Sequence, residues 1–175
     1  MRIIITIITF ILTIAVAPAQ SHGIYQLPPF ERAVCCIKFF EGLHHAQDYP
    51  YIGYGHRIQP GEHFRLPLTR KQADALLRRD LHKLCKMFRS YGKDSLLLAT
   101  LAYNVGYGTL MGHANHPKSR LVQKIESGDR NIHNDYIRFC CYKGKVVPSI
   151  RKRRKVELLL LYQQIDQNLS DRKTE

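Results

Sequence analysis

The stretch covering residues 41–56 constrains this chain more than any other segment. Glu41 and Gly42 end a mostly apolar run, and Ile37 shares a face with Glu41 if that run is helical. Glycine often follows the last residue of a helix. The sequence therefore predicts a helix over residues 30–41, with Glu41 at its C-terminal end.

Glu41 is a candidate general acid because of this predicted position. Apolar neighbours disfavour a charged carboxylate, and the negative C-terminal end of the helix dipole does the same. Both effects favour the protonated acid. Such an acid can donate a proton to the leaving oxygen of a glycoside near neutral pH.

Glycines alternate with tyrosine and isoleucine in Tyr51-Ile-Gly-Tyr-Gly-His56. This pattern predicts a short strand whose backbone is approached closely by another group. Further along the chain, Thr69 and Gln72 fit a capping box at the start of a helix of about twenty residues that ends before Gly92. The apolar segment 95–106 predicts a central buried helix.

Several blocks of this sequence resemble the phage-type lysozymes of glycoside hydrolase family 24. They are "FFEG" and "YIGYGH" in the first stretch, "AYNVG" ending at Gly106, the segment 118–129, and "FCCYKGKVVPSIRKRRKVE" ending at Glu157. The resemblance spans residues 30–162. It implies an α+β, mainly α fold with two lobes, in which a long helix joins a small β-hairpin lobe to a helical C-terminal lobe.

The same resemblance implies a catalytic site, but the hairpin departs from the family pattern. Glu41 matches the general acid, whereas the family's Asp or Cys nine residues later has no counterpart. Tyr51 stands where the family has Thr, and the hairpin is about five residues short. Asp48 is the only carboxylate between Glu41 and Tyr51. It either helps to orient the attacking water, as groups near Tyr51 could, or shapes the turn before Pro50.

Other site residues are expected from the matched blocks. Tyr54 and the adjacent glycine backbone are expected to line the sugar cleft. Asn104, a polar residue in an apolar helix, is expected either to bond a neighbouring loop or to face the cleft. A basic residue of the last helix, Arg154 or Arg151, is expected to approach Glu41.

Three histidines, His44, His45 and His56, lie in or beside the hairpin. Their spacing matches no familiar zinc arrangement, so no metal is expected. We expect His44 and His45 to be solvated. By the resemblance, His56 is expected to fix the strand through a hydrogen bond or ion pair.

The resemblance predicts a muramidase that cleaves the β-1,4 bond between N-acetylmuramic acid and N-acetylglucosamine without a metal or organic cofactor. Two alternatives remain open. A lytic transglycosylase-like reaction needs only one acid, because the 6-hydroxyl of the sugar replaces water. A catalytically inactive module would use the same cleft only to bind peptidoglycan.

The formal net charge of +13 favours encounter with polyanions, which include nucleic acid, anionic lipid and peptidoglycan with its carboxylate peptides. Alternatively, it only aids solubility. The basic cluster 151–155 would be distributed over more than one helix face, so no specific nucleic acid is expected. We expect a monomer that acts on peptidoglycan.

The chain is expected to contain four parts. Residues 1–19 resemble a secretory signal cleaved after Ala19, and an uncleaved signal anchor is the alternative. Residues 20–29 form a lead-in, 30–166 the lysozyme-like domain, and 167–175 a polar tail. These features predict an exported protein, periplasmic or secreted, which would contact a membrane only through an uncleaved signal.

Five cysteines occur at positions 35, 36, 85, 140 and 141. In the layout implied by the resemblance, Cys35 or Cys36 could pair with Cys140 or Cys141. Five buried free thiols are the alternative.

Overall fold

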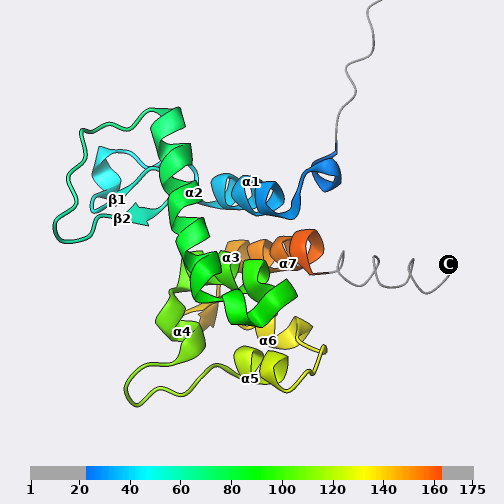
Figure 1. Ribbon diagram of the computed structural model, residues 1–175. Helices are drawn as coiled ribbons and strands as arrows, with labels where there is room; N and C mark the ends of the chain where they lie inside the picture. Colours follow the sequence, from blue (N-terminus) through cyan, green and yellow to red (C-terminus); the bar gives the residue numbers. More distant parts are fainter. Residues whose placement is uncertain (1–22, 163–175) are drawn as a thin grey trace, which may run out of the picture.

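The computed structural model describes residues 23–162, which form two lobes joined by helix α2 (Arg70–Met87) (Figure 1). The other α-helices of this part of the chain are α1 (Pro29–Glu41), α3 (Ser95–Val105), α4 (Tyr107–Met111), α5 (Arg120–Glu126), α6 (His133–Ile137) and α7 (Pro148–Leu161). Three 3-10 segments are η1 (Ile24–Gln26), η2 (Ala46–Asp48) and η3 (Arg89–Asp94). Two antiparallel hairpins pair β1 (Tyr51–Ile52) with β2 (His56–Arg57), and β3 (Cys141–Tyr142) with β4 (Lys145–Val146).

The predicted fold class, α+β and mainly α, is confirmed. A small lobe contains η2 and the β1–β2 hairpin, and a larger helical lobe lies at the other end of α2 (Figure 1). Helix α1 precedes the hairpin in the chain but packs against α3 and α7 of the large lobe. Its C-terminal end therefore lies where the two lobes meet.

The segment 51–56 is a hairpin, and not the single strand that its pattern predicted. Tyr51 pairs with Arg57 and Ile52 with His56. Gly53 and Gly55 have φ values of 59° and 97° in the intervening turn. Residues with a Cβ rarely adopt these angles, so the two glycines reverse the chain within three residues.

Helix α2 begins as the capping box predicted. The Thr69 hydroxyl accepts a hydrogen bond from the Gln72 backbone N–H, and the Gln72 side chain accepts one from the Thr69 backbone N–H. The buried face of α2 includes Leu77 and Leu81, which belong to the same apolar core as α3. Burying each leucine stabilises the fold by roughly 1.5–3 kcal/mol.

Helix α3 is the central buried helix, as expected. Its residues from Leu97 to Ala102 are all buried, and α1, α2 and α7 pack around it. Gly106, with a φ of 87°, ends the helix and leaves Asn104 exposed in the last turn. The core thus fixes both α1 and α7 relative to the end of α3.

All five cysteines lie within the described residues, and all are free thiols, so the disulfide between the first helix and the Cys140–Cys141 segment is not formed. Burial raises the pKa of the Cys36 thiol to about 12. Cys36 is therefore a small hydrophobic residue of the core rather than a reactive thiolate.

The expected signal peptide (1–19) and polar tail (167–175) lie outside the described residues. Between residues 23 and 162, no helix has the combination of length and apolar sequence required to cross a membrane.

Candidate active site

Glu41 is the last residue of α1, and Gly42 follows it with a φ of 68°. The predicted helix end is therefore confirmed. The side chain of Glu41 lies against the hairpin turn, where a Cβ on Gly55 would be 3.5–3.6 Å from its carboxyl group. The close approach expected from the glycine pattern is thus the approach of Glu41 to the Gly55 backbone.

The basic side chain that contacts Glu41 comes from Arg153 of α7, and not from Arg154 or Arg151 as predicted. Arg153 Nη1 donates a hydrogen bond of 2.5 Å to Glu41 Oε1. Asn104 Nδ2 approaches the same oxygen at 3.4 Å. The expected apolar surroundings of Glu41 are therefore wrong in detail, because one carboxylate oxygen is held by two polar groups.

A buried carboxylate, Glu157, organises the groups that reach Glu41. It accepts hydrogen bonds from Arg153 Nε at 2.8 Å, from Arg154 Nη1 at 2.5 Å and from the Tyr136 hydroxyl at 2.9 Å. Arg154 then donates through Nη2 to Asn104 Oδ1. One acidic residue thus positions both of the polar groups that contact Glu41.

The charges in this cluster balance. The guanidinium groups of Arg153 and Arg154 are buried, and the carboxylates of Glu157 and Glu41 offset them. Burial opposes the charge of Arg153, but the two carboxylates outweigh that effect and raise its pKa. Removing Glu157, which pairs with both arginines, would leave a buried guanidinium without a counterion, which is costly.

A cleft of about 650 Å³ lies beside this cluster, between the β1–β2 hairpin, α2 and the end of α3. Gly55 and Asn104, both neighbours of Glu41, line it, and so does Tyr51. Asn104 therefore faces the cleft, which was one of its two expected roles. Its side chain bonds Arg154 of α7 and Glu41 of α1, and not a neighbouring loop.

Tyr54 occupies a different position from the one expected. Its ring lies 5.2 Å from the Lys38 ammonium, and its backbone carbonyl accepts a hydrogen bond from the Tyr103 hydroxyl at 2.9 Å. The residues lining the cleft do not include Tyr54. Its contacts secure the hairpin turn against α3.

Asp48 uses its carboxylate within its own loop. Oδ2 accepts a hydrogen bond of 2.7 Å from the His45 backbone N–H, which completes a capping box on η2. Among the described residues, no hydrogen bond or ion pair connects Asp48 with Glu41. The geometry matches the turn-shaping alternative more closely than the water-orienting one.

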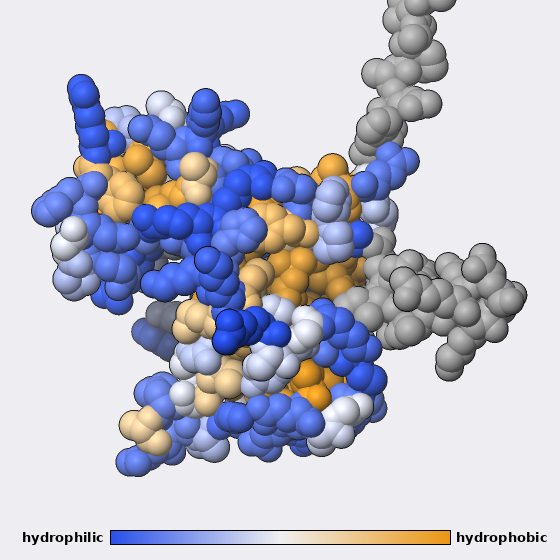
Figure 2. All heavy atoms as spheres, in the orientation of Figure 1, coloured by the Kyte–Doolittle hydropathy of each residue, from blue (hydrophilic) through white to orange (hydrophobic). Residues whose placement is uncertain are grey.

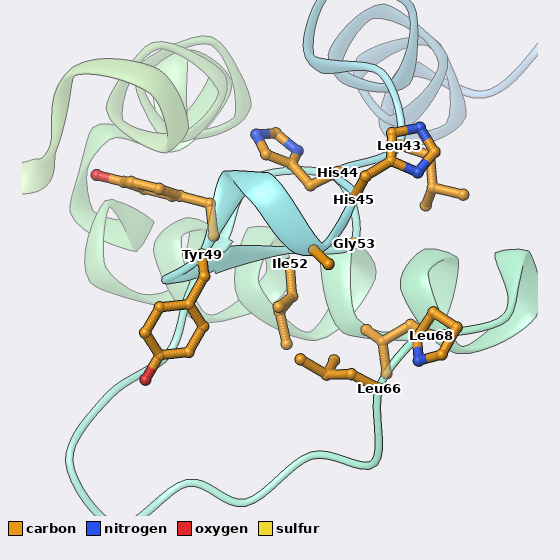
Figure 3. A pocket seen from close by; sticks show the side chains of 11 residues that line it. Leu43, His44, His45, Tyr49, Ile52, Gly53, Leu66 and Leu68 are labelled. Carbon is orange, nitrogen blue, oxygen red and sulfur yellow. The ribbon is translucent and has the colours of Figure 1, made fainter.

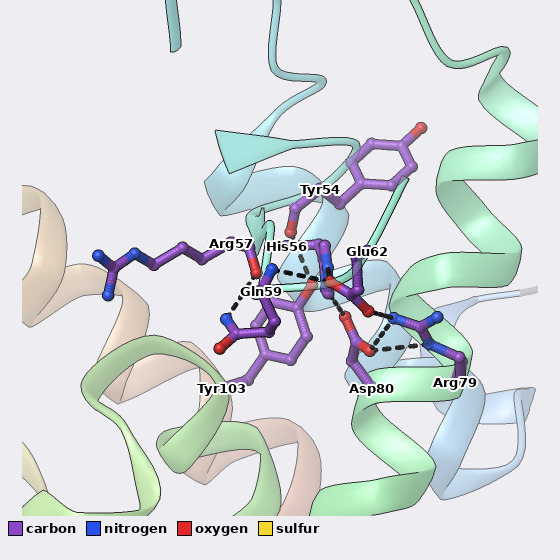
Figure 4. A network of polar contacts seen from close by, with 8 residues as sticks. All are labelled: Tyr54, His56, Arg57, Gln59, Glu62, Arg79, Asp80 and Tyr103. Carbon is purple, nitrogen blue, oxygen red and sulfur yellow. Dashed lines mark hydrogen bonds and ion pairs between the residues drawn. The ribbon is translucent and has the colours of Figure 1, made fainter. Parts of the chain in front are cut away.

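His56 fixes the hairpin to α2, as expected. Nδ1 lies 2.6 Å from Asp80, and Nε2 lies 2.7 Å from Glu62 (Figure 4). A backbone hydrogen bond from Gln59, together with the contact to His56, lowers the pKa of Glu62 to about 2. Arg79 also contacts both acids. The network holds one wall of the cleft in place.

The other histidines contribute no evident metal site, and no group of potential ligands able to hold a metal occurs in residues 23–162. His45 is exposed, and His44 is half-buried with Nδ1 unpaired. Both line a second, mainly apolar hollow of about 300 Å³ in the small lobe (Figure 3). Glu41 is among the lining residues of neither this hollow nor the cleft, whereas Tyr51 lines both.

Arg153, Glu157 and Tyr136 were missed by the sequence analysis. The spacing of Arg153 and Glu157 places them one helical turn apart, which is a recognisable ion-pair pattern. The burial of that pair, however, depends on how α7 packs against α1 and α6.

A family model described as phage lysozyme matches residues 38–157. The matched region begins in α1 and ends at Glu157, so it contains Glu41, the hairpin and the buried cluster. A search of curated proteins finds no significant match.

Proposed function

This chain belongs to the phage lysozyme family, and we propose that it hydrolyses the β-1,4 bond between N-acetylmuramic acid and N-acetylglucosamine, with Glu41 as the general acid. The family consists of glycoside hydrolases that cleave peptidoglycan, so the chain is an enzyme of that class. The particular bond and the role of Glu41 are the proposal.

The observation that carries this proposal is the unequal use of the two oxygens of Glu41. Oε1 accepts hydrogen bonds from Arg153 and Asn104, whereas Oε2 accepts none from the described residues. A Cβ on Gly55 would lie 3.6 Å from Oε2, so this oxygen lies next to a residue that lines the cleft. Oε2 is thus the oxygen available to carry a proton to the substrate.

In the proposed reaction, Oε2 protonates the glycosidic oxygen while positive charge develops on the sugar ring. Proton donation leaves Glu41 as a carboxylate, and the bond between the anomeric carbon and the leaving oxygen breaks. Water then adds to the anomeric carbon and releases a proton to solvent. The Arg153 guanidinium, fixed by Glu157, forms an ion pair with the Glu41 carboxylate.

We assign supporting roles to the remaining site residues on the same basis. Tyr51 and Asn104 line the cleft and would contact the sugar chain. Arg154 holds Asn104 rather than the substrate. Tyr54 acts through its backbone, which positions the hairpin turn.

Digestion of purified peptidoglycan, followed by mass spectrometry of the released muropeptides, tests the proposal. Hydrolysis at the proposed bond produces N-acetylmuramic acid at the reducing end. Products that end in N-acetylglucosamine would contradict the assigned bond. If the walls lose no turbidity, the protein is a binding module with this fold.

The contact of Asp48 within its own loop supports a second candidate function, the lytic transglycosylase-like reaction. That reaction needs no water-activating carboxylate, and Asp48 is already committed to the His45 backbone. An anhydro product in the same mass spectra would establish this route in place of hydrolysis.

Asp48→Asn distinguishes the two roles of this carboxylate. The amide oxygen can still accept the His45 hydrogen bond, so we expect the loop to persist and activity to stay within about threefold of wild type. The activity of Tyr51→Phe serves as the comparison, since Tyr51 lines the cleft. A folded Asp48→Asn enzyme that loses about 100-fold or more activity would make Asp48 catalytic. Circular dichroism would verify folding.

Peptidoglycan lies outside the cytoplasm, so the proposed reaction requires the enzyme to cross the inner membrane. We propose that residues 1–19 direct this export and are then removed. N-terminal sequencing of the exported protein should begin at Gln20, and a sequence beginning at Met1 would instead indicate an uncleaved anchor.

A further inference from the structure

Two basic side chains extend the cleft beyond the catalytic cluster. Arg57 comes from β2 and Lys83 from α2, and both residues are exposed and line the cleft. Neither side chain has a hydrogen bond or an ion pair with any residue in the described part of the chain. They are therefore available to a ligand that occupies the cleft.

The acids nearest this wall are already engaged. Asp80 accepts contacts from His56 and Arg79, and Glu62 is shared by His56, Arg79 and the backbone of Gln59. Figure 4 shows the Arg57 side chain directed away from that network. The network thus fixes the strand that carries Arg57 but does not neutralise its charge.

Two unpaired cations in a concave site concentrate positive potential there and favour an anionic ligand. The glycan strand itself offers neutral hydroxyl and acetamido groups to this wall. The anionic groups of peptidoglycan are carboxylates, mainly those of its stem peptides. Arginine binds a carboxylate through two parallel hydrogen bonds, and lysine adds a point charge.

We propose that Arg57 and Lys83 bind the carboxylates of the stem peptides, so that the preferred substrate is glycan carrying free acidic peptides. This inference rests on the proposed function, because it assumes that peptidoglycan occupies the cleft. It assigns Arg57 of β2 and Lys83 of α2 to substrate recognition, on the cleft wall formed by the hairpin and α2.

The test measures binding to purified walls, freed of teichoic acid, by proteins that carry Glu41→Gln so that no substrate is consumed. One protein adds Arg57→Gln and Lys83→Gln. Its matched control adds Arg65→Gln and Lys86→Gln, which remove the same two charges from exposed residues outside the cleft. General attraction between the basic protein and the wall falls equally in both.

We expect the dissociation constant to rise about tenfold for the cleft pair and less than about twofold for the control, as two exposed ion pairs would allow. On walls whose carboxylates have been converted to methylamides with carbodiimide and methylamine, the two proteins should bind alike. Equal binding on native walls would overturn the inference, and so would a difference that persists on the amidated walls.

Walls stripped of peptides by an amidase identify which carboxylate is bound. The amidase also frees the lactyl carboxylate of muramic acid, which the peptide had held as an amide, so the stripped walls are then methylamidated as well. A difference that persists on these walls, which carry neither stem peptides nor free lactyl carboxylates, would refute the assignment to stem peptides. Cleavage by the protein with native Glu41 is followed in parallel. Cleavage with equal binding rejects this inference alone, whereas cleft-dependent binding without cleavage rejects the proposed function alone.

Discussion

At the residue scale, the two oxygens of Glu41 have different environments, and this difference leads to a direct test. Glu41→Gln removes the transferable proton but keeps the size of the side chain and an oxygen that can face Arg153. We expect peptidoglycan cleavage to fall by at least about 100-fold, the usual scale of general acid catalysis. Release of soluble muropeptides per unit of enzyme would measure the loss.

The fold should survive this substitution, because Arg153 retains its ion pair with Glu157. Glu126→Gln is a suitable control, since it removes one carboxylate from an exposed pair with Lys118. The control should cleave walls at the wild-type rate. A Glu41→Gln enzyme as active as this control would remove Glu41 from the catalytic role.

The sequence identified Glu41 as the candidate acid but did not identify Arg153 as the arginine that contacts it. Glu41 could be found because a helix end and a glycine define it locally. Arg153 lies 112 residues further along the chain, within a run of five basic residues. Which of these residues faces inward is decided by the rotation of α7 against α1, and periodicity does not resolve that rotation among neighbouring basic residues.

At the element scale, α7 connects the large lobe to the catalytic residue through Glu157. Glu157→Gln removes the charge that balances Arg153 and Arg154. Because both guanidiniums are buried, we expect the free energy of unfolding to fall by roughly 3 kcal/mol. The activity of the folded fraction should also fall, since Arg153 and Asn104 lose the group that positions them.

Tyr136→Phe separates positioning from stability. Burial raises the pKa of Tyr136 well above its usual value, so the hydroxyl stays protonated and donates to Glu157. Its removal should cost roughly 1 kcal/mol but leave both arginines paired. Urea unfolding and muropeptide release, measured on both variants, would show the contrast. If folded Glu157→Gln cleaved walls as fast as folded Tyr136→Phe, Glu157 would have only a structural role.

Elements with local signals were predictable, and those without them were not. The Thr69 capping box gave the first residue of α2 because its hydrogen bonds lie within four residues. The 51–56 segment was predicted as one strand because glycines in a strand and glycines in a turn look alike in sequence. The cysteine pairing failed because it relied on the family layout, which does not specify sulfur geometry.

At the scale of the whole molecule, ion pairs on α2 join parts of the chain that are distant in sequence. Arg78 of α2 donates to both oxygens of Glu31 in α1, and Lys38 of α1 donates to Asp74 of α2. His56 joins the hairpin to Asp80 of the same helix. The two-lobed arrangement was predictable only through the family resemblance, since no local pattern encodes these long-range pairs.

The same pairs predict how stability depends on pH. The hydrogen bonds from Arg78 lower the pKa of Glu31. The hydrogen bonds from Lys38 and Arg78 lower the pKa of Asp74. Hydrogen bonds from the Gln59 backbone and from His56 lower the pKa of Glu62 to about 2. A depressed pKa in the folded state stabilises the protein above the unfolded pKa. This stabilisation is lost as the pH falls through the folded value.

We therefore expect the free energy of unfolding, measured by urea denaturation, to be nearly constant from pH 7 to about pH 5. It should then fall steadily between about pH 4.5 and pH 2, because protonation removes these ion pairs. The excess positive charge of the chain also opposes folding in acid.

Glu31→Gln separates the two causes, since it lacks one depressed carboxylate but keeps the general repulsion. Its curve should be flatter than that of the wild type below pH 4.5. Parallel curves would mean that the Glu31–Arg78 pair contributes no pH-dependent stability.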